Sequence, residues 1–291
     1  MVAPSGPVLP RALVAGARVL EEAGFRVVFG RHVRDRRGHL AGPDRTRLED
    51  LNRMLRNPDI RCVLMARGGY GAMRIASEVD WSAMRRDPKV FAGFSDATFL
   101  HLGMAKHAGV RTLHGPNLHG LGAKRGSEVP RLLAWLTQPL PAEHVRTLAA
   151  PRRMDGARGE AVGRVMGGNL ALVHYAASAG YLPPLRGSIL FLEEVNEPPY
   201  KVDGMLCALR EGHWLRGVRG VVLGDFTRCV PRKGHHELTL RQVLEDHLGP
   251  LQAPAWSGLS AGHGVRNYPI PLGARARMAK GRLRFEEGVV S

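Results

Sequence analysis

The chain has 291 residues, of which 44% are hydrophobic and 23% are charged, which is ordinary for a globular protein and enough for about two domains. No stretch approaches the roughly 18 consecutive apolar residues that a membrane helix needs. The start, MVAPSGPVLPRALVAG, lacks the parts of a signal peptide. We therefore expect a cytoplasmic protein with no membrane partner.

The formal net charge of +16 would suit a nucleic-acid-binding protein, because Lys and Arg neutralise phosphates. The basic residues are scattered as single Arg or short pairs, however, and only five Tyr and eight Phe could stack on bases. We interpret the charge as an Arg-rich solvated surface and expect no nucleic-acid partner. A basic nucleic-acid-binding module remains the remote alternative, which salt-sensitive retention on DNA would favour.

The cysteines and histidines show no metal-ligand spacing. Cys62, Cys207 and Cys229 are widely separated and form no CxxC pair, so we expect reduced core residues. The thirteen histidines include no HExxH motif. The sequence therefore predicts neither a metal nor another cofactor.

The first half of the chain alternates strand-length apolar runs with helical patterns. Residues 2–6 read as the tail of a first strand, and a helix over 10–23 places Leu13, Ala17 and Leu20 on one face. Further strands are expected at 25–29, 62–66, 89–94 and 110–115, and further helices at 44–57, 96–109 and 128–137. This alternation is typical of βαβ units, so we predict an α/β fold with a parallel sheet.

The second half follows a stretch rich in Pro, Arg and Gly. We predict an N-terminal domain over 1–138, a linker over 139–161 and a C-terminal domain over 162–291. In the last, the Gly-rich turn MGGN precedes a helix, and strands are expected at 187–195 and 218–226 with helices at 201–212 and 239–249. A hairpin that turns at Lys280 and Gly281 ends the pattern.

Ser95 lies where a predicted strand gives way to a helix. The pattern Gly93-Phe94-Ser95-Asp96-Ala97 approaches G-x-S-x-G, the nucleophile elbow that exposes a serine Oγ on a sharp turn. The amide of Asp96, at the helix N-terminus, could then face a developing oxyanion. The alternative is that Ser95 only caps the helix.

A second glycine-rich loop, Arg67-Gly-Gly-Tyr-Gly, follows the preceding strand. Neither G-x-G-x-x-G nor a GK[ST] motif is present, so nucleotide binding has weak support. We interpret the amide of Gly69 as the second oxyanion donor.

A serine nucleophile needs a histidine base and an acid that orients it. The best histidine is His263 in the loop GLSAGHG, and the best acid is Glu193 at the end of a predicted strand, followed by Glu194. Each could equally be structural, since spacing alone does not establish a triad.

Six motifs in this order resemble those of the LD-carboxypeptidase family: ARGGYGAMRI, GFSDATFLH, LHGPN, MGGNL, FLEEVNEPPYKVDGML and LSAGHG. The resemblance implies that Ser95 is the nucleophile, Glu193 the orienting acid and His263 the base. The choice of Glu193 over Glu194 rests on the resemblance alone. One departure is the short lead-in before VAPSG, which either a clipped first strand or a different start would explain.

The resemblance further implies a Rossmann-like N-terminal domain and a smaller β-rich C-terminal domain, with the triad at their junction, in a homodimer. The expected activity is release of the terminal D-alanine from murein tetrapeptide during cell-wall recycling, without a cofactor. The substrate's free carboxylate needs a partner, for which Arg67 and Asn169 are candidates. The alternative is a microcin-C-immunity-like peptidase that cleaves a peptidyl-nucleotide, for which an aromatic residue such as Trp135 or Trp214 should line the pocket.

Overall fold

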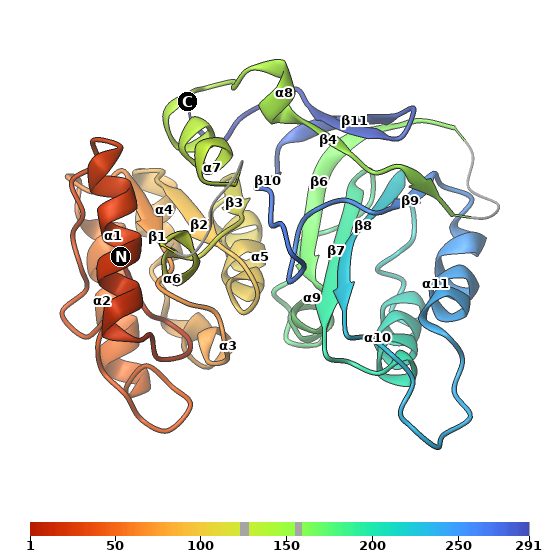
Figure 1. The fold of residues 1–291 in the computed structure, drawn as a ribbon, viewed down its shortest axis with the longest axis horizontal. Helices are drawn as coiled ribbons and strands as arrows, with labels where there is room; N and C mark the ends of the chain where they lie inside the picture. The colour runs from red at the N-terminus through yellow and green to blue at the C-terminus, as the bar shows by residue number, and fades with distance from the viewer. Residues whose placement is uncertain (123–127, 155–158, 291) are drawn as a thin grey trace.

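The computed structural model describes residues 1–122, 128–154 and 159–290 and contains two sheets, each with its own helices (Figure 1). The smaller sheet has the order β1-β2-β3-β10 and the larger has the order β4-β12-β11-β6-β7-β8-β9-β5. The α/β class and the two-unit architecture expected from the sequence are thus confirmed.

The first sheet is parallel apart from one strand. It consists of β1 (Cys62–Leu64), β2 (Val90–Gly93), β3 (Thr112–His114) and β10 (Ile270–Leu272). The first three strands run parallel, whereas β10 comes from the C-terminal half and pairs antiparallel with β3. The two halves of the chain therefore share this sheet.

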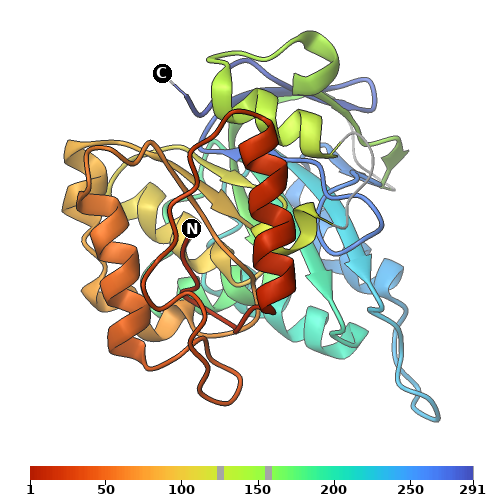
Figure 2. The same cartoon turned by 60° about the vertical axis from the view of Figure 1, so that its left-hand side comes forward.

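Helices of the N-terminal half accompany this sheet, and those at 10–23, 44–57, 96–109 and 128–137 were expected from the sequence. They are α1 (Pro10–Glu22), α2 (Asp44–Arg56), α3 (Ala72–Ile75), α4 (Trp81–Arg86), α5 (Ala97–His107), α6 (Leu118–Leu121) and α7 (Glu128–Thr137). Leu13, Ala17 and Leu20 of α1 are all buried, as expected. Figure 2 brings α1 to the front of the molecule, where it lies beside α6.

The second sheet has a parallel centre flanked by antiparallel strands. Its strands are β4 (Thr147–Ala149), β5 (Arg152–Arg153), β6 (Ala161–Asn169), β7 (Ile189–Val195), β8 (Gly220–Thr227), β9 (Ala255–Ser257), β11 (Arg275–Ala279) and β12 (Arg282–Phe285). Strands β6 to β9 run parallel, and β11 and β12 form the predicted hairpin. Lys280 (φ 50°) and Gly281 (φ 73°) make its turn with two positive φ angles, as a two-residue hairpin turn of type I′ requires.

The helices of the second half are α8 (Glu143–Arg146), α9 (Leu170–Ser178), α10 (Pro199–Glu211) and α11 (Leu240–Leu248). Helices α9, α10 and α11 bury their apolar residues against one face of the second sheet. The segment between β8 and α11 projects from the body of the molecule in both views (Figures 1 and 2).

Five expectations about local structure need correction. Residues 2–6 form no strand, and Val2 makes only an isolated parallel bridge with Met65. Residues 25–29 form no strand and only lie extended beside Met1, through Met1 N–H to Val28 O (2.6 Å) and Gly30 N–H to Met1 O (2.7 Å). The sequence MGGN is the end of β6 rather than a turn, and the predicted linker over 139–161 contributes β4 and β5 to the second sheet. All three cysteines are free, but Cys62 and Cys207 are half-buried rather than core residues. The domain bounds themselves stay a prediction.

Among the described residues, no helix has the length and apolar character needed to cross a bilayer.

Candidate active site

Ser95 occupies a strained turn between β2 and α5. Its φ of +67° lies in the left-handed region, which costs a residue with a Cβ about 1–2 kcal/mol. Such strain at the end of a buried strand, just before a helix, is the geometry of a nucleophile elbow. Gly68 fits against it so closely that a Cβ there would lie 2.9 Å from Cβ and 3.1 Å from Oγ of Ser95.

We therefore expect Gly68→Ala to lower kcat by roughly 10-fold, because the added methyl would push Ser95 by a few tenths of an ångström, whereas a shift of about 1 Å can cost on the order of 100-fold. The φ of Gly68 is not in the left-handed region, so the backbone itself accepts alanine. Steady-state peptide hydrolysis and thermal unfolding of the variant would test this. A fully active Gly68→Ala enzyme would contradict the expectation that close packing of Gly68 fixes the position of Ser95 Oγ.

Glu193 and His263 form a hydrogen-bonded pair. Glu193 lies in β7 and is fully buried, and its Oε2 is 2.7 Å from Nδ1 of His263. The His263 side chain is 19% exposed, so its other nitrogen can meet a substrate. This is the acid-to-histidine contact that orients a general base.

The His263 loop lies over the elbow. The imidazole ring of His263 is 4.9 Å from the ring of Phe94, the neighbour of Ser95. Asp225 of β8 holds the loop, because its amide donates to Ala261 O (2.9 Å) and its carboxylate packs closely against Gly264. The structure thus gathers the elbow, Glu193 and His263 from three distant segments.

Electrostatics keep Glu193 ionised. Burial on its own raises the pKa of this carboxyl, but the imidazoles of His114 and His263 outweigh it and lower the pKa to about 2. A lowered acid pKa stabilises the fold above the unfolded value of about 4.3, and that contribution is lost as the pH falls toward 2. Glu193 therefore carries its charge throughout the neutral range.

Glu194 points to the other face of the sheet. Its Oε1 accepts from Asn169 Nδ2 (2.9 Å) and its Oε2 from the amide of Ala171 (2.8 Å). These contacts fasten the start of α9 to β7. Glu194 thus has a structural role, because it connects β7 to α9. The geometry supports Glu193 as the acid that orients His263.

The two predicted oxyanion donors flank the elbow. Asp96 is the N-cap residue of α5 and directly follows Ser95, and Gly69 (φ +111°) lies in the loop whose Gly68 touches Ser95. The carboxylate of Asp96 accepts from Ser5 Oγ (2.5 Å) and the amide of Ala72 (2.8 Å), which joins the elbow to this loop. The assignment of the Asp96 and Gly69 amides as donors stays a prediction.

The two candidates for binding a substrate carboxylate differ. Arg67 is exposed near the elbow, where Nη1 donates to Pro7 O (2.7 Å). Asn169 is buried, and its side chain both caps α9 through the amide of Leu172 (3.3 Å) and donates to Glu194. Both polar atoms of the Asn169 side chain are therefore already hydrogen-bonded within the protein. A contact with substrate stays a prediction for Arg67 and for Asn169.

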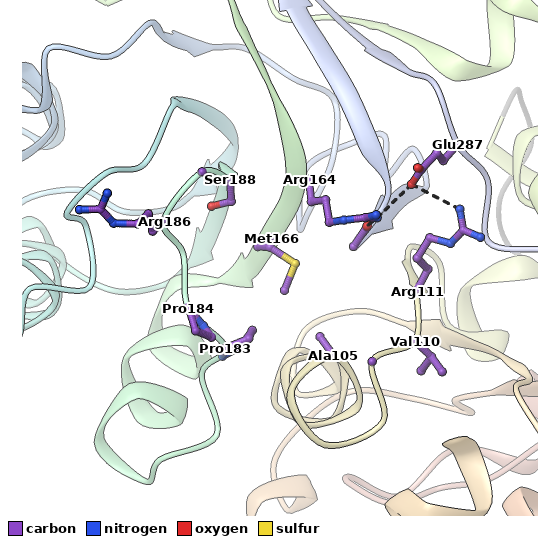
Figure 3. Close-up of a pocket in the computed structure, with 13 residues that line it drawn as sticks. Ala105, Val110, Arg111, Arg164, Met166, Pro183, Pro184, Arg186, Ser188 and Glu287 are labelled. Atoms are coloured by element: carbon purple, nitrogen blue, oxygen red, sulfur yellow. Dashed lines mark hydrogen bonds and ion pairs between the residues drawn. The ribbon is translucent and has the colours of Figure 1, made fainter. Parts of the chain in front are cut away.

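A separate cleft of about 570 Å³ opens at the ends of the strands opposite to Ser95 (Figure 3). Arg111 precedes β3 and Ser188 precedes β7, so the cleft lies at the amino ends of strands whose carboxyl ends carry the elbow site. Glu287 Oε2 joins Arg111 (3.4 Å) and Arg164 (3.0 Å) there. None of its lining residues is a candidate catalytic residue.

Sequence reasoning missed three side chains of the site, namely Asp225, the carboxylate of Asp96, and His114, which lies 3.9 Å from Glu193. The position of His114 at a strand end in LHGPN was the only available signal. No group of three potential metal ligands gathers within the described part of the chain.

Comparisons with known proteins identify the family of this chain. A model of the LD-carboxypeptidase N-terminal domain matches residues 1–115, and one of the LD-carboxypeptidase C-terminal domain matches residues 162–278. A probable murein peptide carboxypeptidase of Bacillus subtilis is 36% identical, over 96% of this chain and 87% of its own. A murein tetrapeptide carboxypeptidase of Pseudomonas aeruginosa is 33% identical, over 98% of this chain and 94% of its own.

Solved structures share the fold. The crystal structure of muramoyltetrapeptide carboxypeptidase from Oxalobacter formigenes superposes with a TM-score of 0.84 at 26% identity, over 99% of this chain and 98% of its own. The structure of MccF in complex with glutamyl sulfamoyl guanosine also has a TM-score of 0.84, over 99% of this chain and 96% of its own, but its 21% identity supports the fold alone. The chain therefore belongs to the LD-carboxypeptidase family and is a carboxypeptidase.

Proposed function

We propose that this chain is a serine LD-carboxypeptidase that releases the terminal D-alanine of murein tetrapeptide. The observation that carries the proposal is the hydrogen bond between buried Glu193 and His263, beside a strained serine at an elbow. The names of the relatives from Bacillus subtilis and Pseudomonas aeruginosa support the substrate class. We also propose that the enzyme works in the cytoplasm, as a homodimer, in peptidoglycan recycling.

In the proposed reaction, Ser95 Oγ attacks the carbonyl carbon of the L-centre while Nε2 of His263 takes its proton. The amides of Asp96 and Gly69 hold the oxyanion. His263 then protonates the amine of D-alanine, which leaves, and water hydrolyses the acyl-enzyme by the same route. Glu193, which is charged at neutral pH, stabilises the imidazolium in both steps.

The alternative substrate is a peptidyl-nucleotide, as in the immunity protein MccF. The aromatic residues that could stack a base do not favour it. Trp135 is only 1% exposed and packs on Phe285 in the core, and Trp214 is half-buried and packs against the core that α9, α10 and α11 share with the second sheet. The choice between the two substrates is decided by assay.

With purified murein tetrapeptide, we expect release of D-alanine and accumulation of the tripeptide. The D-Ala-D-Ala bond of a pentapeptide should react at least about 100-fold more slowly, because a D-acyl centre would displace its carbonyl from Ser95 by about 1 Å. Chromatography of both digests would measure this, with Ser95→Ala as the matched control. Cleavage of a peptidyl-adenylate mimic without release of D-alanine would contradict the proposal in favour of the immunity-type activity.

A further inference from the structure

His114 is a buried titratable side chain that the proposed reaction does not use. It ends β3 and is fully buried. Neither Nδ1 nor Nε2 has a hydrogen-bond partner among the described residues. A buried N–H without a partner costs free energy, so a histidine at this position needs an explanation.

The polar group that His114 faces is Glu193. Nε2 of His114 is 3.9 Å from Oε1 of Glu193, an oxygen that also lacks a hydrogen-bond partner within the described residues. The other carboxylate oxygen, Oε2, contacts His263. The carboxylate therefore lies between two imidazoles, and two unsatisfied atoms face each other on the side away from His263.

The remaining neighbours of His114 leave it no other polar partner in the described structure. The rings of Phe94 (6.0 Å) and Phe191 (5.1 Å) contact it edge-on. His101 of α5 lies 6.3 Å away between ring centres and engages Gly93 O through Nε2 (2.9 Å). Burial lowers the pKa of His101 to about 3, so this ring stays neutral beside His114.

We propose that His114 is a positioning residue for the triad: with its proton on Nε2, it holds Oε1 of Glu193 and thereby keeps Oε2 directed at Nδ1 of His263. Closing the gap by about 1 Å would give a hydrogen bond of ordinary length. Such bonds are often long without substrate and tighten in the complex. This role rests on the proposed function, because His114 acts on the reaction only through Glu193 and His263.

The test compares two variants of His114 that differ in whether the side chain carries an N–H donor. His114→Gln keeps an N–H donor near the position of Nε2, whereas His114→Met has a similar reach and no donor. We expect His114→Met to lower kcat for D-alanine release about 10- to 100-fold with KM changed less than about 2-fold. Loss of a hydrogen bond that orients a metal-binding side chain has an effect of this size in metalloenzymes. His114→Gln should recover most of kcat.

A purely structural role predicts the opposite order. His114 is surrounded by Phe94 and Phe191, so an apolar Met would suit the site better than a polar Gln if packing alone mattered. Activity of His114→Met equal to or above that of His114→Gln would overturn the proposal.

A measurement on the wild type covers the case in which neither variant folds. Nitrogen-15 NMR of the histidine rings should find Nε2 of His114 protonated, and an Nε2 that carries no proton would contradict the role. This readout is also independent of the substrate. If the wild type releases no D-alanine, the proposed function fails while the tautomer still decides whether His114 serves Glu193.

Discussion

Ser95→Ala is expected to abolish D-alanine release, with kcat lowered by about 10⁴- to 10⁶-fold, the range seen when a serine nucleophile is removed. The reason is chemical, because in the proposed reaction the acyl-enzyme forms on the hydroxyl of Ser95, which the substitution removes. Alanine and serine both carry a Cβ, so the substitution leaves the strain at φ +67° unchanged. Thermal unfolding should therefore match the wild type while the endpoint assay shows no product.

Ser95→Gly is the matched comparison. It removes the same hydroxyl, but glycine adopts positive φ without the clash of a Cβ. We expect Ser95→Gly to be as inactive as Ser95→Ala and about 1 kcal/mol more stable in urea unfolding. Equal stability of the two variants would mean that the elbow is not strained, and near-normal turnover by either would remove Ser95 from the mechanism.

The parts of the fold that depend on local pattern were predictable from the sequence. The hairpin turn at Lys280 and Gly281 follows from turn chemistry, and the buried face of α1 follows from helical spacing. Long-range pairing was not predictable in this way. Residues 25–29 have strand-like composition, but Phe25 N–H donates to Leu20 O at the end of α1, Val28 O accepts from the Met1 amino group, and the segment does not extend the sheet.

The glycines of MGGN show why composition misled the prediction of β6. A glycine pair normally indicates a turn. Here Gly167 and Gly168 lie inside a strand with φ angles of +129° and +139°, and other groups also approach too closely for side chains. A Cβ at Gly167 would lie 2.0 Å from Phe191 O, and one at Gly168 would lie 2.6 Å from Thr98 Oγ1. Both neighbours are distant in sequence, so no local signal could reveal them.

The candidate active site also combines residues that a local pattern reveals with residues that only long-range contacts reveal. Ser95 is recognisable because its elbow is local, and family resemblance rather than spacing indicated Glu193 and His263. His114 and Asp225 escaped notice because each matters only through contacts with segments far along the chain.

The paired glutamates provide the last prediction, because their side chains lie on opposite faces of β7. Glu193→Gln should lower kcat by about 10³- to 10⁴-fold with little change in KM, since the amide cannot stabilise the imidazolium and favours the wrong tautomer of His263. Glu194→Gln should retain activity within about 10-fold. It should instead lose about 1–3 kcal/mol of stability, because one glutamine oxygen cannot accept from both Asn169 and Ala171.

A second readout separates the two positions by pH. The lowered pKa of Glu193 stabilises the wild type above about pH 4, and this contribution disappears toward pH 2. The stability difference between wild type and Glu193→Gln should therefore shrink across that interval. Burial raises the pKa of Glu194, so its variant should show no such convergence with the wild type as the pH falls from 4 to 2. If Glu194→Gln is instead the inactive variant, the orienting acid is the neighbouring residue, and the contact between Glu193 and His263 is structural.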